Sequence, residues 1–309
     1  MFTKASQVQK KLKVLIYGPS GSGKTHMALT FPKPAVIDME GGTDLFADRF
    51  DFAVLRTKDH DEVMQAVEYI AANPDQYETL IIDPITVLWQ VLMEAGQMMA
   101  EDRAKRKGRS ADEASLTQRD WGIIKRKVNA LYTRLVNMPC HVVMVGRIKD
   151  VNETRGQNVV KVGEKVDAEK STEYMFDVVI KLTSNGSRIG LVEKDRSGKL
   201  QGQKIENPTF AMFADILKVT STGTHVEQTD PTEAAAKTAK TMELDTAMPT
   251  IAKWPELHDA TVKQLGYNHA AHVKNTLKQI FNGSAGELTF EAAWAELVKH
   301  QQAKDEVPA

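Results

Sequence analysis

The sequence predicts an α/β protein, in which a mostly parallel β-sheet is flanked by helices and followed by a small helical module. Short apolar runs alternate with helical patterns over the first two thirds of the chain, which is typical of parallel strands with crossover helices. One apolar run leads directly into a glycine-rich turn and a helix. A stretch rich in Thr, Ala, Glu and Lys then precedes renewed helical periodicity. We therefore expect a core over 1–218, a flexible linker over 219–250 and a helical module over 251–302.

Composition excludes several classes of protein. The chain has 309 residues, 42% of them hydrophobic, and a formal net charge of −1. The whole chain is therefore not attracted to nucleic acid or acidic lipid, and any basic surface must be local. The single cysteine excludes an intramolecular disulfide. No apolar run is long enough to cross a membrane, and the polar N-terminus does not resemble a signal peptide, so we expect a cytoplasmic protein with no membrane partner.

The expected elements follow from residue periodicity. Alternating steps of three and four, from Trp121 through Ile124 to Leu135, predict an amphipathic helix, and 84–102 is predicted as another helix with Met99 on its apolar face. The remaining core elements are strands at 13–17, 35–38, 52–55, 79–83 and 141–145 and a helix at 59–72. Residues 147–173 form a long polar segment, predicted as a loop. Residues 177–183 and 187–194 predict an antiparallel hairpin around Asn185-Gly186.

The segment that follows strand 13–17 has the pattern of a phosphate-binding loop. It matches G-x-x-x-x-G-K-[ST] at every fixed position, through Gly18, Pro19, Ser20, Gly21, Ser22, Gly23, Lys24 and Thr25. The glycines allow backbone N–H groups to surround an anion, and the helix that follows directs its positive end toward the phosphates. Lys24 can reach the β- and γ-phosphates, and the hydroxyl of Thr25 can bind Mg²⁺. The expected ligands are thus ATP and Mg²⁺.

Two further strands end in carboxylates. Asp83 follows Leu80-Ile81-Ile82 and is expected to hold Mg²⁺ directly or through water. Strand 35–38 ends in Asp38, and Glu40 lies two residues further on; because alternate residues of a strand share a face, we expect both to point the same way. Glu40 lies farther out, at the edge where open α/β sheets bind ligands, so it is the candidate to orient or deprotonate the attacking water. The alternative is a solvated turn acid.

A local basic segment lies in the middle of the chain. Between Arg103 and Lys127 there are nine Lys or Arg residues against three acids. Four of them are expected to follow a nucleic-acid backbone, namely Lys105, Arg106, Lys107 and Arg109. The alternative is an ordinary solvated surface. Neither 103–109 nor 147–173 contains an aromatic residue, so base stacking is not evident and binding is expected to have no sequence preference.

The order of these features resembles the RecA-like recombinase core. More narrowly, Tyr-Gly-Pro-Ser-Gly-Ser-Gly-Lys-Thr, Ile-Asp-x-Glu, Leu-Ile-Ile-Asp-Pro, and Lys-Asp-Arg followed by Ile-Glu-Asn-Pro are similar to phage-encoded AAA-type nucleotide-binding proteins, which include single-strand-annealing ATPases. The resemblance covers about 1–218. It implies that Glu40 is the catalytic carboxylate, Asp83 the Mg²⁺-associated acid, and the end of strand 141–145 the γ-phosphate sensor. RecA proteins have Gln after Asn at that point, whereas this chain has Gly146-Arg147, so Arg147 would contact the γ-phosphate.

The resemblance also implies interactions beyond the nucleotide. The segment 147–173 would contact DNA through Lys149, Arg155, Lys161 and Lys165. Lys194 and Arg196 would reach the ATP of a neighbouring subunit, or else lie on an exposed hairpin without that role. Phe2 and Ala5 match a Phe-x-x-Ala element by which some recombinases insert into an adjacent core, although a frayed N-terminus explains the pattern equally.

We therefore expect a phage protein that binds single-stranded DNA and ATP, acts in recombination or annealing as a homo-oligomeric filament or ring, and hydrolyses ATP. Its C-terminal module would meet DNA, a neighbouring subunit or a single-strand-binding protein. The alternatives are a P-loop kinase, an AAA+ ATPase that remodels another substrate, and an assembly factor whose hydrolysis is incidental. No acceptor motif of a kinase is visible. An AAA+ module would have a helical lid directly after the core, where this sequence predicts a linker.

Overall fold

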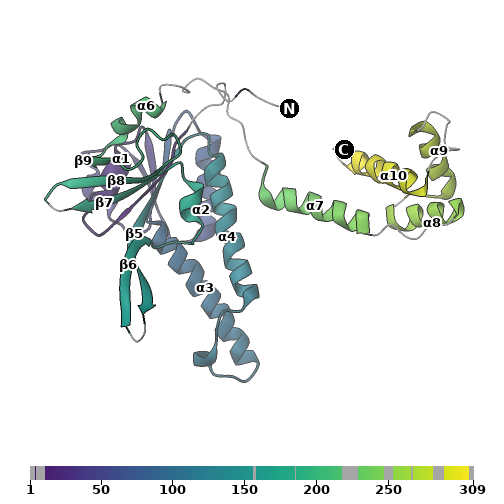
Figure 1. The fold of residues 1–309 in the computed structure, drawn as a ribbon, viewed down its shortest axis with the longest axis horizontal. Helices are drawn as coiled ribbons and strands as arrows, with labels where there is room; N and C mark the ends of the chain where they lie inside the picture. Colours follow the sequence, from purple (N-terminus) through teal and green to yellow (C-terminus); the bar gives the residue numbers. More distant parts are fainter. Residues whose placement is uncertain are drawn as a thin grey trace. The chain divides into compact units, whose positions relative to one another are not determined.

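The structure is a computed structural model that describes residues 4, 11–155, 158–184, 186–217, 229–246, 253–265, 267–280 and 289–305. Contacts divide the chain into two compact units, Met1–Gln228 and Thr229–Ala309. The first unit contains the sheet and the second consists of helices (Figure 1). The division between the two units lies within the expected linker 219–250.

The first unit is built on one sheet with the strand order β3-β2-β4-β5-β1-β7-β8-β9. The strands from β3 to β7 in this order pair in parallel, whereas β8 and β9 are antiparallel. β6 pairs only with the far part of β5. The bounds are β1 Lys13–Gly18, β2 Pro34–Asp38, β3 Ala53–Arg56, β4 Thr79–Asp83, β5 His141–Arg155, β6 Asn158–Val166, β7 Val178–Ser184, β8 Arg188–Asp195 and β9 Lys204–Glu206.

Helices cover both faces of this sheet. Because neighbouring residues of a strand face opposite sides, Leu15 packs under one helical layer and Ile16 under the other. The first layer comprises α2 His60–Ala72, α3 Ile85–Arg106 and α4 Gln118–Asn137. The second comprises α1 Lys24–Leu29, the 3-10 helix η4 Phe210–Phe213 and α6 Ala214–Leu217. This arrangement confirms the predicted α/β class with a mostly parallel sheet flanked by helices.

Side chains at the helix ends fix α3 to α4. Thr117 and Asp120 form a capping box at the start of α4, which satisfies backbone N–H groups that have no partner within the helix. Asp120 also accepts two hydrogen bonds from the guanidinium of Arg103, at 2.8 and 2.6 Å. The last turns of α3 are therefore held against the first turn of α4, next to the short 3-10 helix η3 Ala111–Glu113.

The prediction that Met99 and Trp121 belong to the core is wrong. Met99 on α3 is 46% exposed and Trp121 on α4 is 37% exposed. Figure 1 shows that α3 and α4 continue past the sheet, so their outer turns have no strand to cover. Helical periodicity identified the helices correctly but did not show where the sheet ends.

The predicted loop 147–173 is also wrong, because β5 continues to Arg155 and pairs with β6 as a hairpin. A short helix, α5 Thr172–Met175, follows. Val159 and Val160 are neighbours on β6, so they face opposite sides of the hairpin, and they are 69% and 39% exposed. Neither face is buried there, and the sequence therefore lacks the alternation of apolar and polar residues that marks a half-buried strand. The second predicted hairpin is confirmed as β7 and β8, which pair from Val178↔Asp195 to Ser184↔Arg188.

The second unit contains four helices within its described residues. Part of the expected linker is helical, because α7 spans Pro231–Thr246. Its sequence is rich in the good helix formers Ala, Glu and Lys, and Asp230 accepts a 2.7 Å hydrogen bond from the N–H of Thr232 at its start. The three helices predicted after it are present as α8 Trp254–Leu265, α9 Ala270–Ile280 and α10 Phe290–Asp305. They enclose their own apolar cluster, which includes Leu257, Val273, Leu277, Trp294 and Leu297. None of the described helices is both long and apolar enough to cross a membrane.

Candidate nucleotide-binding site

The predicted phosphate loop connects the end of β1 to α1 at the carboxyl edge of the sheet. Gly18 leaves β1 where the chain touches β7, and a Cβ at this position would lie 2.3 Å from the carbonyl oxygen of Leu182, so a side chain does not fit. Within the loop, the buried hydroxyl of Ser22 donates a 2.9 Å hydrogen bond to the carbonyl of Pro19. The close contact of Gly18 with β7 and the hydrogen bond from Ser22 to Pro19 therefore fix the loop at two points.

Lys24, Thr25 and Asp83 lie together, as the sequence predicted. The ammonium of Lys24 donates a 2.7 Å hydrogen bond to the carbonyl of Pro19 across the loop. Thr25 Oγ1 donates to Asp83 Oδ2 at 2.6 Å. A hydroxyl and a carboxylate side by side are the oxygen ligands that Mg²⁺ prefers, with water and phosphate oxygens supplying the rest. These two residues fit the metal that a nucleotide site of this kind uses.

Burial controls the charges of this group. It raises the pKa of Asp83 to about 6, while the hydrogen bond from Thr25 and the charge of Lys24 oppose that rise and the charge of Asp38 adds to it. Burial lowers the pKa of Lys24, which Asp83 counteracts and the charge of Arg147 reinforces. Burial disfavours the charged forms of both Asp83 and Lys24, and the charge of each residue favours the charged form of the other.

Glu40, just beyond the end of β2, and Arg147, on β5, form an ion pair at the same edge. Their side chains are 41% and 49% exposed. Arg147 is the register partner of Gly18 across β1 and β5, and its backbone N–H donates to Thr86 Oγ1 at 2.9 Å. The structure therefore places the predicted catalytic carboxylate and the predicted γ-phosphate sensor in contact, beside the phosphate loop.

The expectation that Asp38 and Glu40 share a face is wrong, because β2 ends at Asp38 and Glu40 lies in the bend beyond it. Asp38 is buried and accepts hydrogen bonds from the N–H groups of Glu40, Gly41 and Thr43 and from the hydroxyl of Thr43, at 2.6–3.0 Å. Burial alone would raise its pKa, but these hydrogen bonds lower it overall. Asp38 holds the turn that positions Glu40, before the 3-10 helix η2 Thr43–Phe46.

The arrangement is suited to transfer of a phosphoryl group to water. Lys24 and Arg147 supply positive charge for the phosphate oxygens, and Glu40 supplies a carboxylate that can orient or deprotonate water. In this structure Arg147 contacts Glu40, so the guanidinium and the carboxylate are paired with each other. If Arg147 turned to a γ-phosphate, Glu40 would become available as a base.

Lys194 and Arg196 lie at the opposite edge of the sheet. β8 runs antiparallel to β7, and its last residue, Asp195, pairs with Val178 at the start of β7. Lys194 donates to the carbonyl of Glu173 at 2.7 Å, and Arg196 donates to Asp177 Oδ1 at 3.1 Å. Neither side chain belongs to the phosphate loop of its own subunit, and the role toward a neighbour stays a prediction.

The predicted DNA-binding residues fall into two surroundings. Lys105, Arg106, Lys107 and Arg109 are exposed at the far end of α3, and no ion pair involves them within the described part of the chain. The hairpin cations are mostly neutralised: Lys149 pairs with Asp167 at 2.7 Å, and Lys161 pairs with Asp150 and Glu164. Lys165 is half-buried on β6. The side chain of Arg155 and the residues Phe2 and Ala5 lie outside the described residues.

Sequence reasoning missed Arg188, the first residue of β8. Its aliphatic stem lies against the Cα of Gly23, where a Cβ would be 2.4 Å from Arg188 Cδ. The sequence did indicate that Arg188 lies just after the turn of a hairpin. The missing information was that β7 is the neighbour of β1, so that this turn lies beside the phosphate loop.

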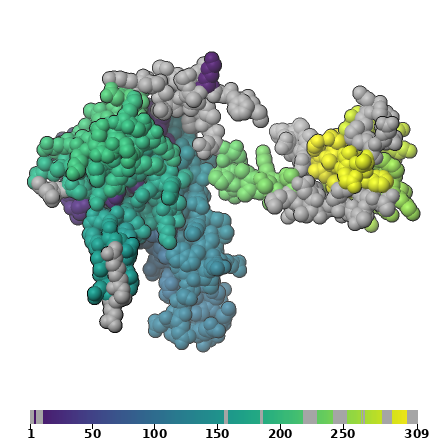
Figure 2. All heavy atoms as spheres, in the orientation of Figure 1, coloured from purple at the N-terminus to yellow at the C-terminus, as the bar shows by residue number. Residues whose placement is uncertain are grey.

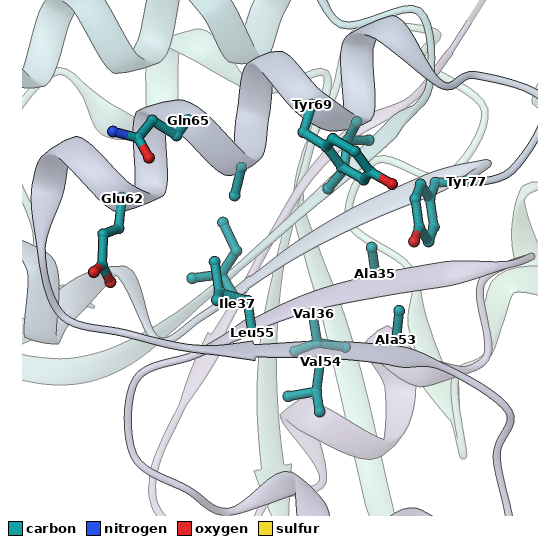
Figure 3. Close-up of a pocket in the computed structure, with 12 residues that line it drawn as sticks. Ala35, Val36, Ile37, Ala53, Val54, Leu55, Glu62, Gln65, Tyr69 and Tyr77 are labelled. Atoms are coloured by element: carbon teal, nitrogen blue, oxygen red, sulfur yellow. The ribbon is translucent and has the colours of Figure 1, made fainter.

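An apolar groove of about 510 Å³ lies at the other end of the sheet, between α2 and the strands β2 and β3. Figure 3 shows Glu62 and Gln65 toward one end and the rings of Tyr69 and Tyr77 toward the other. β3 is the last strand on this side in the described sheet, and Val54 and Tyr69 are 47% and 56% exposed. The groove is therefore an open apolar surface next to a strand edge.

The fold and the phosphate loop define this chain as a P-loop nucleotide-binding protein. The sequence profile of the AAA domain family matches residues 10–238, well over half of the chain. The chain belongs to this family of P-loop ATPases. The comparison with curated proteins finds no match.

Proposed function

We propose that this protein is an ATP-dependent single-stranded-DNA-binding protein of a phage, which acts in recombination or annealing as a homo-oligomer. The ATPase class is that of its family. The DNA-binding role is supported mainly by the basic cluster at the end of α3, defined as Lys105, Arg106, Lys107 and Arg109. Four exposed cations, free of ion pairs among the described residues, are a concentrated positive surface on a chain whose net charge is −1.

The shape of the core also supports this proposal. In the space-filling view, the α3–α4 projection and the β5–β6 hairpin are separate lobes that extend from the same side of the core (Figure 2). A polyanion could contact the basic cluster on one lobe and Lys165 on the other. Because acids already neutralise Lys149 and Lys161, we expect the hairpin to contribute less than the basic cluster.

Oligomer formation is the second part of the proposal. Lys194 and Arg196 lie at the sheet edge opposite the phosphate loop, which suits a head-to-tail assembly in which one subunit completes the site of the next. The apolar groove beside β3 has room for the Phe2 ring of a neighbouring copy, with Ala5 following. Burying one Phe contributes about 2–3 kcal/mol. Phe2→Ala is expected to reduce the size of the ATP- and DNA-bound complex in sedimentation, and an unchanged size rules this contact out.

Salt dependence of DNA binding tests the main proposal. Each phosphate contact contributes about −0.7 to the slope of log affinity against log salt for a single strand, so replacing Lys105, Arg106 and Lys107 by Ala should flatten that slope by about 2. Every DNA sequence should be weakened alike. The matched control replaces the exposed Lys170, Lys199 and Lys204 elsewhere on the core, and its slope should remain that of the wild type.

Two outcomes contradict DNA binding at the basic cluster. An unchanged affinity and slope in the triple variant would show that the cluster is an ordinary solvated surface. If the wild-type protein does not bind single-stranded DNA at any salt concentration and DNA does not change its ATPase rate, the alternative of an ATPase acting on another substrate stands.

A further inference from the structure

One side chain reaches the phosphate loop from the hairpin side. The stem of Arg188 passes over Gly23, the residue that precedes α1, with Cδ, Cγ and Nε all within 3.6 Å of the place a Cβ would take. Gly23 has φ +88°, so both its conformation and its neighbour require glycine here. The guanidinium therefore lies beside the backbone that forms the anion-binding loop.

Among the described residues, no carboxylate pairs with this guanidinium. In the described parts of the chain, no ion pair or side-chain hydrogen bond of Arg188 is present, although its carbonyl accepts from the N–H of Asn207. His26 is adjacent: its ring packs edge-on against Phe50, and its buried Nδ1 lacks a hydrogen-bond partner among the described atoms. A half-buried positive region with an unsatisfied ring nitrogen favours an anion.

The topology indicates which part of a nucleotide meets this region. Asp83, Glu40 and Arg147 all lie on strands on one side of β1 or just beyond them, and they mark the Mg²⁺ and terminal-phosphate end. Arg188 lies on the other side of β1, beyond β7. If a triphosphate lies across the loop with its terminal phosphate near Asp83, Glu40 and Arg147, its nucleoside end points toward β7 and β8.

We propose that Arg188 binds the α-phosphate of the nucleotide held by its own subunit, as a nucleotide-binding residue distinct from those of the phosphate-loop motif. Lys194, near the other end of β8, and Arg196, just beyond that end, lie at the opposite edge of the sheet. The inference rests on nucleotide binding at the phosphate loop and is independent of DNA binding.

The α-phosphate is common to ATP and ADP, and this gives a sharp test. Arg188→Gln keeps most of the stem against Gly23 but removes the charge, so we expect the affinities for ATP and ADP to fall together by about 10- to 100-fold, the range of a charged hydrogen bond. Calorimetric titration of the full-length protein with each nucleotide measures both. Lys204→Gln, which removes an exposed charge from the neighbouring β9, is the matched control and should bind both nucleotides normally.

Each other outcome overturns the assignment in a recognisable way. Unchanged affinities in Arg188→Gln, with a normal melting temperature, exclude the contact. A loss confined to ATP would place Arg188 at the γ-phosphate. Lys24→Ala tests nucleotide binding at the phosphate loop separately from the Arg188 contact. Normal nucleotide binding in that variant would show that the nucleotide does not bind at the phosphate loop.

Discussion

The ion pair between Glu40 and Arg147 leads to a prediction with two opposite effects. Glu40→Gln removes the carboxylate that we assign to water activation and also releases Arg147 from its partner. If Glu40 is the base, turnover should fall by about 10²-fold or more. If Arg147 binds the γ-phosphate, the same substitution should tighten ATP binding, because the guanidinium no longer has to leave Glu40.

The size of the second effect follows from exposure. Both side chains are more than 40% exposed, so solvent screens the pair and its contribution is about 0.2–1 kcal/mol. ATP should therefore bind about 1.5- to 5-fold more tightly, whereas ADP, which lacks the γ-phosphate, should bind as in the wild type. Turnover and affinity are thus expected to move in opposite directions.

Phosphate release measures turnover, and titration with a non-hydrolysable ATP analogue and with ADP measures affinity. Glu68→Gln is the matched control, since Glu68 is also an exposed glutamate paired with an arginine, Arg134, at 2.9 Å. It should leave turnover and both affinities unchanged. Wild-type turnover in Glu40→Gln would refute the catalytic role, and weaker binding of the ATP analogue would refute the exchange of partners by Arg147.

Two further predictions concern the charge of Asp83 and the separate helical unit. Burial raises the pKa of Asp83 from 3.8 to about 6, so the folded protein retains a proton that the unfolded chain releases, and this group's contribution to stability falls as pH rises from about 4 to 6. Asp83→Asn should remove that dependence in urea unfolding at several pH values while lowering Mg²⁺-dependent turnover; an unchanged pH profile contradicts the raised pKa. A chain ending at Gln228 should keep its ATP affinity, because the two units have separate apolar clusters; insolubility or loss of ATP binding would show that the helical unit supports the ATPase core.

The phosphate-loop part of the site was predictable because its residues are fixed by local sequence. Lys24 and Thr25 follow a strand within one motif, and Asp83 ends a short apolar run that is typical of a buried strand. Glu40 was identified from its place beyond strand 35–38 and Arg147 through the resemblance, but their contact depends on β2, β4 and β5 being consecutive in the sheet. Sequence periodicity does not give strand order.

The errors have the same physical origin. Arg188 reaches Gly23 only because β7 lies next to β1, a long-range relation that leaves no local pattern. The β5–β6 hairpin was missed because a strand pair with two solvated faces does not need alternating apolar residues. Trp121 was assigned to the core because a helix keeps its periodicity after the sheet beneath it has ended.

The continuity of β5 has a mechanical consequence. Arg147, beside the phosphate loop, and Ile148 to Arg155, in the hairpin, belong to one uninterrupted strand. At about 3.3 Å per residue, those eight residues form a lever of about 26 Å, so that a change of about 5° in strand direction at Arg147 displaces the far end by about 2 Å. A single piece of backbone thus joins the guanidinium that contacts Glu40 to a projection from the core, without any intermediate element.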